Sequence, residues 1–449
     1  MNKTMYLPAA VAACIRTLED AGFAAYGVGG CVRDSLLGIQ PHDYDLCTNA
    51  TPEETARLFA DHTLVRSGEK HGTIGVVVEG EVIEITTFRT EGGYADSRHP
   101  DWVRFVPTVE EDLSRRDFTV NAMAYNPTRG YIDPFGGQQD LENKILRAVG
   151  DPHTRFTEDA LRILRGVRFA VRFQLTPEKK TRLAMNELAG LMENLAKERI
   201  FDELCKLLPL VNDRDLLEFA PVLTSVLPEL APCVGFQQHN PHHKYDVYTH
   251  TAQVVSAVPG DLAVRWAALL HDCGKPACFT LDETGRGHFI GHAAESAKIA
   301  EAVLLRLKAP TALRERVVFL VEKHMTPLAA DKKLLRRRLG QYGEEALHQL
   351  LALQEADFGG KGVKNGEEEP FSAIGTLLAE VLAEDACLTV KDLAINGKDL
   401  IEMGIPAGPQ IGQCLASLLE QVQDEKIPKT REALITATQA FPRGEGGRA

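Results

Sequence analysis

Residues 27–46 read GVGGCVRDSLLGIQPHDYDL, and this stretch decides the fold of the first part of the chain. Gly29 and Gly30 lie near its start, and Asp43 and Asp45 lie near its end. If the acidic end is a strand, both carboxylates project from one face, because side chains alternate across a strand. Mg²⁺ takes one or two such carboxylates plus substrate phosphates, and glycines let the backbone approach a triphosphate closely. The stretch therefore predicts a divalent-metal site for phosphoryl chemistry.

The size and composition of the chain indicate a globular protein of several domains. Its 449 residues favour two to four domains, and its 44% hydrophobic and 25% charged residues are those of an ordinary soluble protein. Residues 1–23 resemble an amphipathic helix, not a secretory signal, and we find no apolar run of the roughly twenty residues that cross a bilayer. We therefore expect a cytoplasmic protein without a membrane partner.

The nine cysteines are scattered without the paired spacing of a zinc site or a disulfide framework. We expect reduced, partly buried thiols, as is usual for cytosolic proteins.

Charge points to a local and selective anionic partner. The net charge of −13 argues against indiscriminate binding of nucleic acid. A basic face nevertheless recurs at three- and four-residue intervals along a probable helix, with Arg162, Arg165, Arg168 and Arg172, and Arg155 comes just before them. Like charges stacked in this way destabilise a helix, which suggests compensation by an anion. The alternative is a solvated surface stripe.

Changes in pattern along the chain divide it into four regions. An α+β head with a mixed sheet and helices covers residues 1–150, and a helical neck covers residues 151–226. A histidine-rich helical region covers residues 227–360, and a helical tail covers residues 361–449. The Gly/Glu-rich segment 359–370 has the composition of an exposed loop or linker.

Two further motifs of the head suit the same chemistry. The run HGTIGVVVEGEVIEITTFR, residues 71–89, predicts a hairpin around Glu79–Glu81, with Glu84 on a strand beside the first acidic pair. Glu84 is either a companion of these acids or a structural strand acid. Arg115 and Arg116 offer paired cations for phosphates.

These motifs together resemble the class II tRNA nucleotidyltransferases and bacterial poly(A) polymerases of the polymerase-β-like superfamily. The matching runs are GVGGCVRDSLLG with DYDL, RRDFTVNAMAYN, DPFGGQQDL, EDALRILRGVRF, LAKERIFDEL and NGKDLIEMGIPAGPQIG. The resemblance covers essentially the whole chain. It implies a nucleotidyltransferase head followed by an all-α neck, body and tail, and template-independent addition of nucleotides to the 3′ end of tRNA.

The resemblance also implies roles for individual residues. Asp43 and Asp45 would be catalytic residues that hold two Mg²⁺ ions, with Glu84 beside them. Gly30, Arg33 and Arg116 would contact the triphosphate; Asp159 and Arg162 would read the Watson–Crick edge of CTP or ATP; and Arg165 and Arg168 would face phosphate. The reading pair is chemically reasonable, since a carboxylate accepts from an exocyclic amine while a guanidinium donates to a ring nitrogen or carbonyl. For each arginine the alternative is a surface ion pair with a nearby Glu.

The segment 87–100 is rich in glycine and charge, which is typical of a loop. In the resembling family a loop here with an Arg…Tyr pattern, matched by Arg89 and Tyr94, helps the switch from C to A addition. Its presence favours complete CCA addition.

A second candidate metal site lies in the helical middle of the chain. Its residues are His250, His271, Asp272, His292, His324 and Asp357, and imidazoles with carboxylates suit Zn²⁺, Mn²⁺, Fe or Ni²⁺. The run LLHDCGKP and these positions resemble the HD-domain phosphohydrolases over residues 240–360, and the set of six resembles their two-metal members. That resemblance implies 2′,3′-cyclic phosphodiesterase, 2′-nucleotidase or phosphatase activity, with Lys275 near a phosphate. The alternative is ordinary surface or core histidines.

Three functional hypotheses follow from these patterns. The leading one is an enzyme that adds C, C and A to tRNA from CTP and ATP and carries an embedded HD phosphohydrolase. A related alternative is a poly(A) polymerase or a partial, A-adding or CC-adding enzyme. A different class is an RNA-binding HD hydrolase with an inactive transferase head, against which the intact Asp43, Asp45, Arg116, Asp159 and Arg162 argue, because a pure binding module needs no metal carboxylates.

Overall fold

The computed structural model describes residues 4–92, 102–362, 371–384 and 387–441. Tyr94 and most of the segment 359–370 lie outside these ranges. The chain forms two compact units, one of Met1–Ala231 with Arg306–Lys308 and one of Pro232–Leu305 with Ala309–Ala449. In the described ranges, no helix is both long and apolar enough to cross a membrane.

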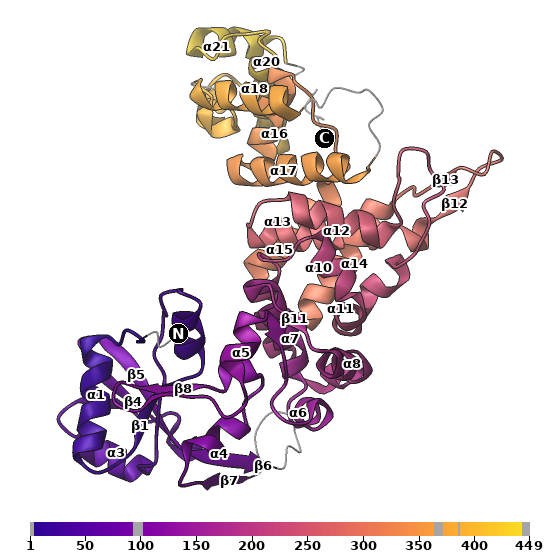
Figure 1. The fold of residues 1–449 in the computed structure, drawn as a ribbon. Coiled ribbons are helices and arrows are strands. Elements are labelled where there is room, and N and C mark those ends of the chain that lie inside the picture. Colours follow the sequence, from indigo (N-terminus) through magenta and orange to yellow (C-terminus); the bar gives the residue numbers. More distant parts are fainter. Residues whose placement is uncertain (1–3, 93–101, 363–370, 385–386, 442–449) are drawn as a thin grey trace. The chain divides into compact units, whose positions relative to one another are not determined.

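The head of the first unit contains a mixed sheet (Figure 1). It has seven strands in the order β3-β4-β5-β2-β1-β8-β9. Its strands are β1 (Ala25–Val28), β2 (Leu46–Thr48), β3 (Thr63–Val65), β4 (Thr73–Val78), β5 (Glu81–Thr87), β8 (Ala124–Asn126) and β9 (Gly130–Ile132). Strands β2 and β5 pair in parallel, and β4 and β5 form the antiparallel hairpin predicted around Glu79–Glu81. The predicted mixed sheet of the head is confirmed.

Two helices, α1 (Ala9–Asp20) and α3 (Pro52–Leu58), cover one face of this sheet (Figure 1). Their apolar sides meet strand residues in a core that includes Ile15, Leu18, Phe59 and Ile85. Helix α3 begins at a capping box, in which Thr51 and Glu54 satisfy each other's backbone N–H groups. A second core lies around β1, β2 and β8 and includes the buried Phe88 and Leu113.

The remaining elements of the first unit are short strands and helices that follow the sheet. The strands are β6 (Arg89–Gly92) with β7 (Trp102–Phe105), and β10 (Ile145–Leu146) with β11 (Thr176–Pro177). The helices are α2 (Gly30–Leu36), α4 (Val109–Ser114), α5 (Gly137–Glu142), α6 (Pro152–Glu158), α7 (Leu161–Phe173), α8 (Lys179–Glu187), α9 (Lys197–Leu207), α10 (Asp213–Glu218) and α11 (Ala220–Val226). Helix α7 confirms the helix predicted for the basic face.

Helix α7 approaches the head at a glycine. A Cβ at Gly166 would lie 2.9 Å from the Phe118 ring, which is fully buried. Only a residue without a side chain allows this contact, so Gly166 fixes the basic helix against the segment that carries Arg116 and Asp117.

The acidic pair differs from its sequence prediction in one respect. Asp43 and Asp45 precede β2 in extended chain and do not belong to the strand, which begins at Leu46. The strand is short because hydrogen bonding to β5 begins only at Leu46, which lies opposite Ile85. The same register places Asp45 next to Glu84 on the neighbouring strand, because each residue immediately precedes one of the paired residues.

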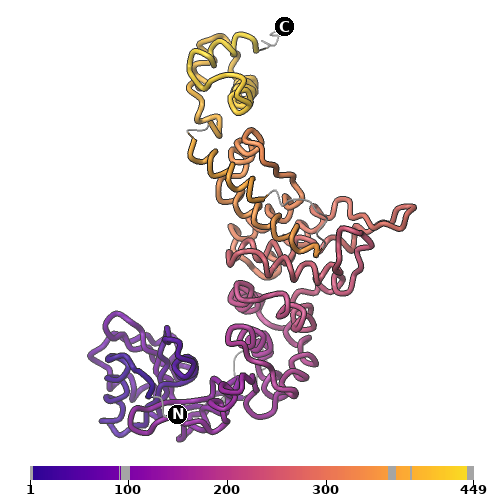
Figure 2. The backbone as a smooth tube through the Cα atoms, turned by 45° about the horizontal axis from the view of Figure 1, so that its top comes forward, coloured from indigo at the N-terminus to yellow at the C-terminus, as the bar shows by residue number. Residues whose placement is uncertain are grey.

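The second unit is helical. Its helices are α12 (Val247–Ala257), α13 (Leu262–Leu270), α14 (His292–Arg306), α15 (Thr311–Lys323), α16 (Lys332–Tyr342), α17 (Glu344–Gly360), α18 (Phe371–Ala383), α19 (Gly397–Glu402), α20 (Pro409–Gln423) and α21 (Arg431–Gln439). Helices α12, α13, α15 and α17 pack together. A hairpin of β12 (Thr280–Leu281) and β13 (Gly287–His288) extends from them in both views (Figures 1 and 2).

All nine cysteines are free thiols, as the absence of paired spacing predicts. Seven of them are buried, so they act as small apolar side chains of the cores.

Candidate functional site

A cavity of about 440 Å³ in the first unit gathers most of the head and neck residues singled out from the sequence. Its lining consists of Gly29, Gly30, Arg33, Asp45, Arg115, Arg116, Asp117, Asn121, Asp159, Leu161, Arg162, Arg165, Arg168, Phe169, Arg172 and Arg199. Eight arginines against three aspartates make it a strongly cationic cavity. Such a lining favours a polyanionic ligand.

The glycine pair shapes one wall of this cavity. Gly29 has φ +76°, and a Cβ there would lie 2.7 Å from Arg116 Nη1. The positive φ favours glycine at position 29, and the missing side chain leaves room for the Arg116 guanidinium beside the backbone. Helix α2 follows directly and carries Arg33, whose guanidinium pairs with Asp34 at 2.7 Å and stacks on the Phe173 ring at 4.3 Å.

Carboxylates outside α7 hold three of its arginines. Arg165 Nη2 lies 2.8 Å from Asp117 Oδ2, and Arg168 Nε lies 2.6 Å from Glu203 Oε2. Arg162 and Arg168 are only 8% and 7% exposed. Arg162, Arg165 and Arg168 are all ion-paired, as the alternative of surface ion pairs predicted, but all three line a cavity, and Arg162 and Arg168 are buried.

Asp159 and Arg162 are fixed from two sides. Asp159 Oδ2 accepts from Arg199 Nη2 at 2.9 Å, and Arg162 Nη1 donates to Glu158 Oε2 at 2.7 Å. Arg162 also donates to the backbone carbonyls of Arg155 and Arg115. The two side chains therefore have defined orientations before any ligand binds.

Sequence reasoning missed Arg199 and Glu158 as partners of this pair. Both stand inside the runs LAKER and EDALR that carried the family resemblance. Arg199 lies 40 residues from Asp159, so only the packing of α7 on α9 reveals the contact.

The three acids of the head occupy neighbouring positions. Asp45 lines the cavity, whereas Asp43 and Glu84 do not. Burial raises the pKa of Asp45, Glu84 and Asp43 raise it further, and Arg116 opposes them. A divalent cation would relieve this repulsion. Within the described residues these acids do not form a group whose ligand atoms all lie within 4.8 Å of one another.

Arg89 lies at the edge of the head. It begins β6, and its backbone N–H donates to Asp112 Oδ1 at 3.2 Å. It is not in the lining of the cavity, and Tyr94 lies outside the described residues.

The Asp117–Arg165 pair makes a testable contribution to stability. Burial would raise the pKa of Asp117, but Arg165 and a hydrogen bond from Asn121 hold it at about 2. Because the folded pKa is depressed, the stabilisation is present above about pH 4 and is lost as pH falls towards 2. Asp117→Asn should therefore lower the free energy of unfolding by about 2 kcal/mol at pH 7 and much less at pH 2. Urea titrations at both values measure this; an equal loss at both would contradict it.

The second unit brings all six predicted metal-site residues together. His250 comes from α12, and His271 and Asp272 follow α13. His292 begins α14, His324 follows α15, and Asp357 lies in α17. All are buried except the half-buried Asp357. These residues are therefore neither scattered nor on the surface.

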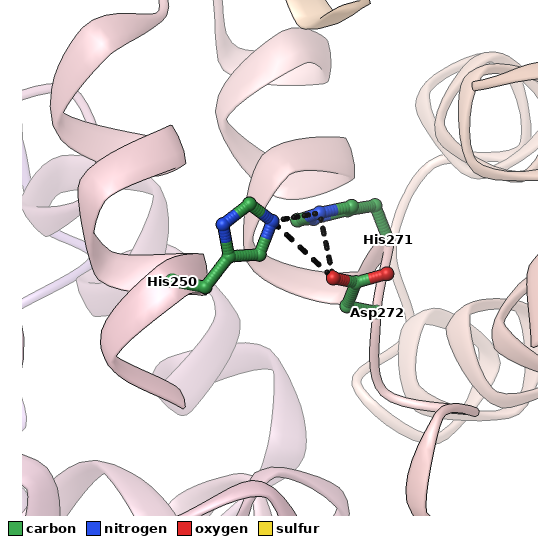
Figure 3. Close-up of side chains that lie close together, drawn as sticks. All are labelled: His250, His271 and Asp272. Atoms are coloured by element: carbon green, nitrogen blue, oxygen red, sulfur yellow. Dashed lines mark hydrogen bonds and ion pairs between the residues drawn. The ribbon is translucent and has the colours of Figure 1, made fainter. Parts of the chain in front are cut away.

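Asp272 stands between two groups of imidazoles. Its Oδ2 lies 3.4 Å from His250 Nε2 and 3.2 Å from His271 Nε2 (Figure 3). Its Oδ1 lies 3.4 Å from His292 Nε2 and 4.0 Å from His324 Nε2. Two groups of three therefore share Asp272: one with His250 and His271, the other with His292 and His324. Within each group the ligand atoms all lie within 4.8 Å of one another, as a bound metal ion requires.

The remaining contacts of the centre add a carboxylate and a cation. Asp357 Oδ1 lies 2.9 Å from His250 Nε2, on the side of the first group. Lys275 Nζ lies 2.7 Å from Asp272 Oδ2. Burial opposes charge on His271, but Asp272 and Asp357 outweigh it and raise the pKa of this imidazole to about 10.

Backbone carbonyls orient three of the imidazoles. The Nδ1 atoms of His271, His292 and His324 lie 2.8, 2.8 and 2.6 Å from the carbonyl oxygens of Ala268, Phe289 and Val321. A carbonyl only accepts, so each Nδ1 carries a proton, and each ring in its neutral form directs the lone pair of Nε2 into the centre. This arrangement is typical of metal-ligating histidines and fits a pair of divalent ions.

Fold and cavity together define a nucleotidyltransferase head of the poly(A) polymerase type. A family model described as "Poly A polymerase head domain" matches residues 25–147, and one described as "Probable RNA and SrmB- binding site of polymerase A" matches residues 174–212. Residues 289–438 match a model described as "tRNA nucleotidyltransferase domain 2 putative".

Similarity to individual proteins extends over nearly the whole chain. The CCA-adding enzyme of Levilactobacillus brevis is 35% identical over 94% of this chain and 95% of its own length. That of Streptococcus gordonii is 36% identical over 94% of each. The crystal structure of the Bacillus stearothermophilus CCA-adding enzyme with CTP matches with a TM-score of 0.72 and 28% identity over 96% of each chain. The chain belongs to the CCA-adding enzyme family.

Proposed function

We propose that this protein adds C, C and A to the 3′ end of tRNA, using CTP and ATP. The observation that supports this most strongly is the cationic cavity that joins Asp45 to the fixed pair of Asp159 and Arg162. The names of the similar proteins agree with it.

Phosphoryl transfer requires a divalent metal, for which the carboxylates of Asp43 and Asp45 are suitable ligands, with Glu84 beside them. Mg²⁺ bound there would supply charge neutralisation and activation of the attacking hydroxyl. Gly30, Arg33 and Arg116, which line the cavity, would hold the triphosphate. The 3′-oxygen of the RNA loses its proton and bonds to the α-phosphorus, and the bond from this phosphorus to pyrophosphate breaks.

The proposed base selection follows from the hydrogen-bonding groups of Asp159 and Arg162. The carboxylate of Asp159 accepts from the exocyclic amine of cytosine or adenine, while Arg162 donates to a ring nitrogen or carbonyl. Uracil has a carbonyl oxygen where cytosine has its amine, so UTP would face the carboxylate with an acceptor. Arg165 and Arg168 lie on the same helix and would face phosphate.

Substituting Arg162 should therefore weaken discrimination. We expect Arg162→Ala to reduce the preference for CTP over UTP by about tenfold or more, the order of one good base contact, and to change overall nucleotide affinity less. Single-nucleotide incorporation assays measure the ratio of kcat/KM values. Arg182→Ala, which breaks an ion pair with Glu218 elsewhere in the first unit, is the matched control. Unchanged discrimination in Arg162→Ala would count against the reading role.

The regions proposed for this activity are the head (1–150), the helical neck (151–226) and the tail (361–449) that would contact tRNA. Arg89 and Tyr94 are proposed to assist the change from C to A addition. A poly(A) polymerase or an A-adding or CC-adding enzyme is the related alternative.

One assay separates these activities. Purified protein is incubated with tRNA that lacks its 3′ terminus, with Mg²⁺ and with labelled CTP, ATP or both, and the products are sequenced. Addition of C, C and then A supports the proposal. Addition of A alone, of CC alone or of a long A tract would support the alternatives, and no addition would support an inactive head.

The six-residue centre favours a second activity, phosphoester hydrolysis, for residues 227–360. Transition-metal ions such as Ni²⁺, Mn²⁺, Zn²⁺ or Fe would supply activation of water and polarisation of phosphate. Hydrolysis places the oxygen of water on phosphorus, breaks a P–O ester bond and transfers a proton to the leaving ribose oxygen. Release of phosphate from 2′-nucleotides, or ring opening of 2′,3′-cyclic phosphates, in the presence of each metal tests this activity.

A further inference from the structure

The cluster of six metal-site residues in the second unit is called the histidine centre below; its members are His250, His271, Asp272, His292, His324 and Asp357. It opens into a pocket of about 250 Å³ with two chemically different parts. Its inner part contains Asp272, His292 and His324. Its lining also includes Lys275 and Lys361, which add positive charge, and the apolar residues Phe289, Ile290 and Met325. A phosphate ester with an apolar substituent would match both parts.

Two of the apolar residues are unusually exposed for a pocket lining. Ile290 is 87% exposed and Met325 is 57% exposed. Single apolar residues on a surface need no explanation, but these two line one pocket. Each is also close in sequence to a residue of the centre, Ile290 two positions before His292 and Met325 directly after His324.

The backbone holds both residues in place. The carbonyl of Phe289, next to Ile290, accepts from His292 Nδ1 at 2.8 Å. Gln354 Nε2 donates to the carbonyls on both sides of Met325, those of His324 at 2.9 Å and Thr326 at 2.6 Å. The His292 ring thus holds the backbone next to Ile290, and Gln354 holds the backbone on both sides of Met325, so the chain that carries both apolar residues is fixed before a ligand binds.

Two lysines add positive charge to the lining of this pocket. Lys275 Nζ is 2.7 Å from Asp272 Oδ2 and donates to Gln238 Oε1 at 2.9 Å, while Lys361 completes the lining. A phosphate at the centre would thus meet positive charge, and a planar ring attached to it would meet apolar side chains. Nucleotides have both features.

We propose that Ile290 and Met325 form a base-binding subsite, through which the histidine centre selects phosphate esters of nucleosides over small phosphate esters. This inference rests on the proposed hydrolase activity. It goes beyond that activity by assigning the contact with the base of the nucleotide to these two residues. The two residues are specificity determinants, and the chemistry stays with the histidine centre.

Kinetics with two substrates of the same bond type test the subsite. For Ile290→Ser and Met325→Ser we expect KM for adenosine 2′,3′-cyclic phosphate to rise about tenfold, the effect of losing roughly one buried apolar contact, with kcat little changed. KM for glycerol 1,2-cyclic phosphate should stay the same, because this ester lacks a base. Ile401→Ser, an exposed isoleucine on α19 of the same unit, is the matched control.

A second measurement does not depend on turnover. Photolysis of the protein with 8-azidoadenosine 2′,3′-cyclic phosphate, followed by peptide mass spectrometry, should label peptides that contain Ile290 or Met325. Labelling elsewhere in the second unit, or unchanged KM values in both variants, would overturn the subsite. Absence of hydrolysis of either ester with every metal would instead overturn the hydrolase, and the crosslinking result would then decide the subsite by itself.

Discussion

Asp45→Ala is expected to reduce nucleotide addition on the order of 10³-fold and to leave phosphoester hydrolysis unchanged. Asp45 lines the cationic cavity, next to Glu84 across the β2–β5 pair, and burial, followed by the carboxylates of Glu84 and Asp43, raises its pKa. Removing this carboxylate would remove a proposed ligand of the metal that the transfer step needs. The histidine centre lies in the other unit and shares no residue with the cavity.

Two further variants separate the loss of the Asp45 charge from other effects of the substitution. Asp45→Asn keeps the volume but not the charge and should be nearly as inactive. Asp61→Ala removes an exposed aspartate of the same unit and should be fully active. If Asp45→Ala abolished both activities while remaining folded, the independence of the two sites would be refuted.

His271→Ala should have the opposite pattern. We expect hydrolysis to fall at least about 100-fold, since even outer partners of metal ligands alter activity 10–100-fold, while addition of CCA is unaffected. His271 lies 3.2 Å from Asp272 in the first group of ligands, and its ring is fixed by the carbonyl of Ala268. The bound metal per protein, measured by inductively coupled plasma mass spectrometry, should fall in parallel.

A fully buried histidine also contributes to packing, so the metal measurement needs a control for folding. His348→Ala alters an exposed histidine on α17 of the same unit and should keep both metal and hydrolysis. The histidine centre would be excluded as the hydrolytic site if the His271→Ala protein had the same unfolding transition as the unsubstituted protein, retained its metal and still hydrolysed the ester.

Local patterns predicted the elements of the head well. Alternation and the Glu79–Gly80 turn gave the β4–β5 hairpin, and three- and four-residue spacing gave α7. The strand assigned to Asp43 and Asp45 was wrong, because the end of β2 depends on hydrogen bonding to β5, which is nearly 40 residues away in sequence. Periodicity carries no information about where a neighbouring strand begins to pair.

The candidate sites were predictable to different degrees. The residue types of the cavity followed from motifs, but the contacts that orient Asp159 and Arg162 come from Arg199 and Glu158 and depend on helix packing. The histidine centre draws on five helices, so only the adjacent His271 and Asp272 formed a local pattern, and the other ligands came from family resemblance. The apolar mouth had no pattern in the sequence, because an isolated isoleucine or methionine is indistinguishable from core material.

The most direct test of the central claim is a crystal structure of the protein with CTP and Mg²⁺. The proposal expects the cytosine edge within hydrogen-bonding distance of Asp159 and Arg162, with the triphosphate close to Gly30, Arg33 and Asp45. A well-ordered CTP bound elsewhere, with its base away from Asp159 and Arg162, would contradict the account.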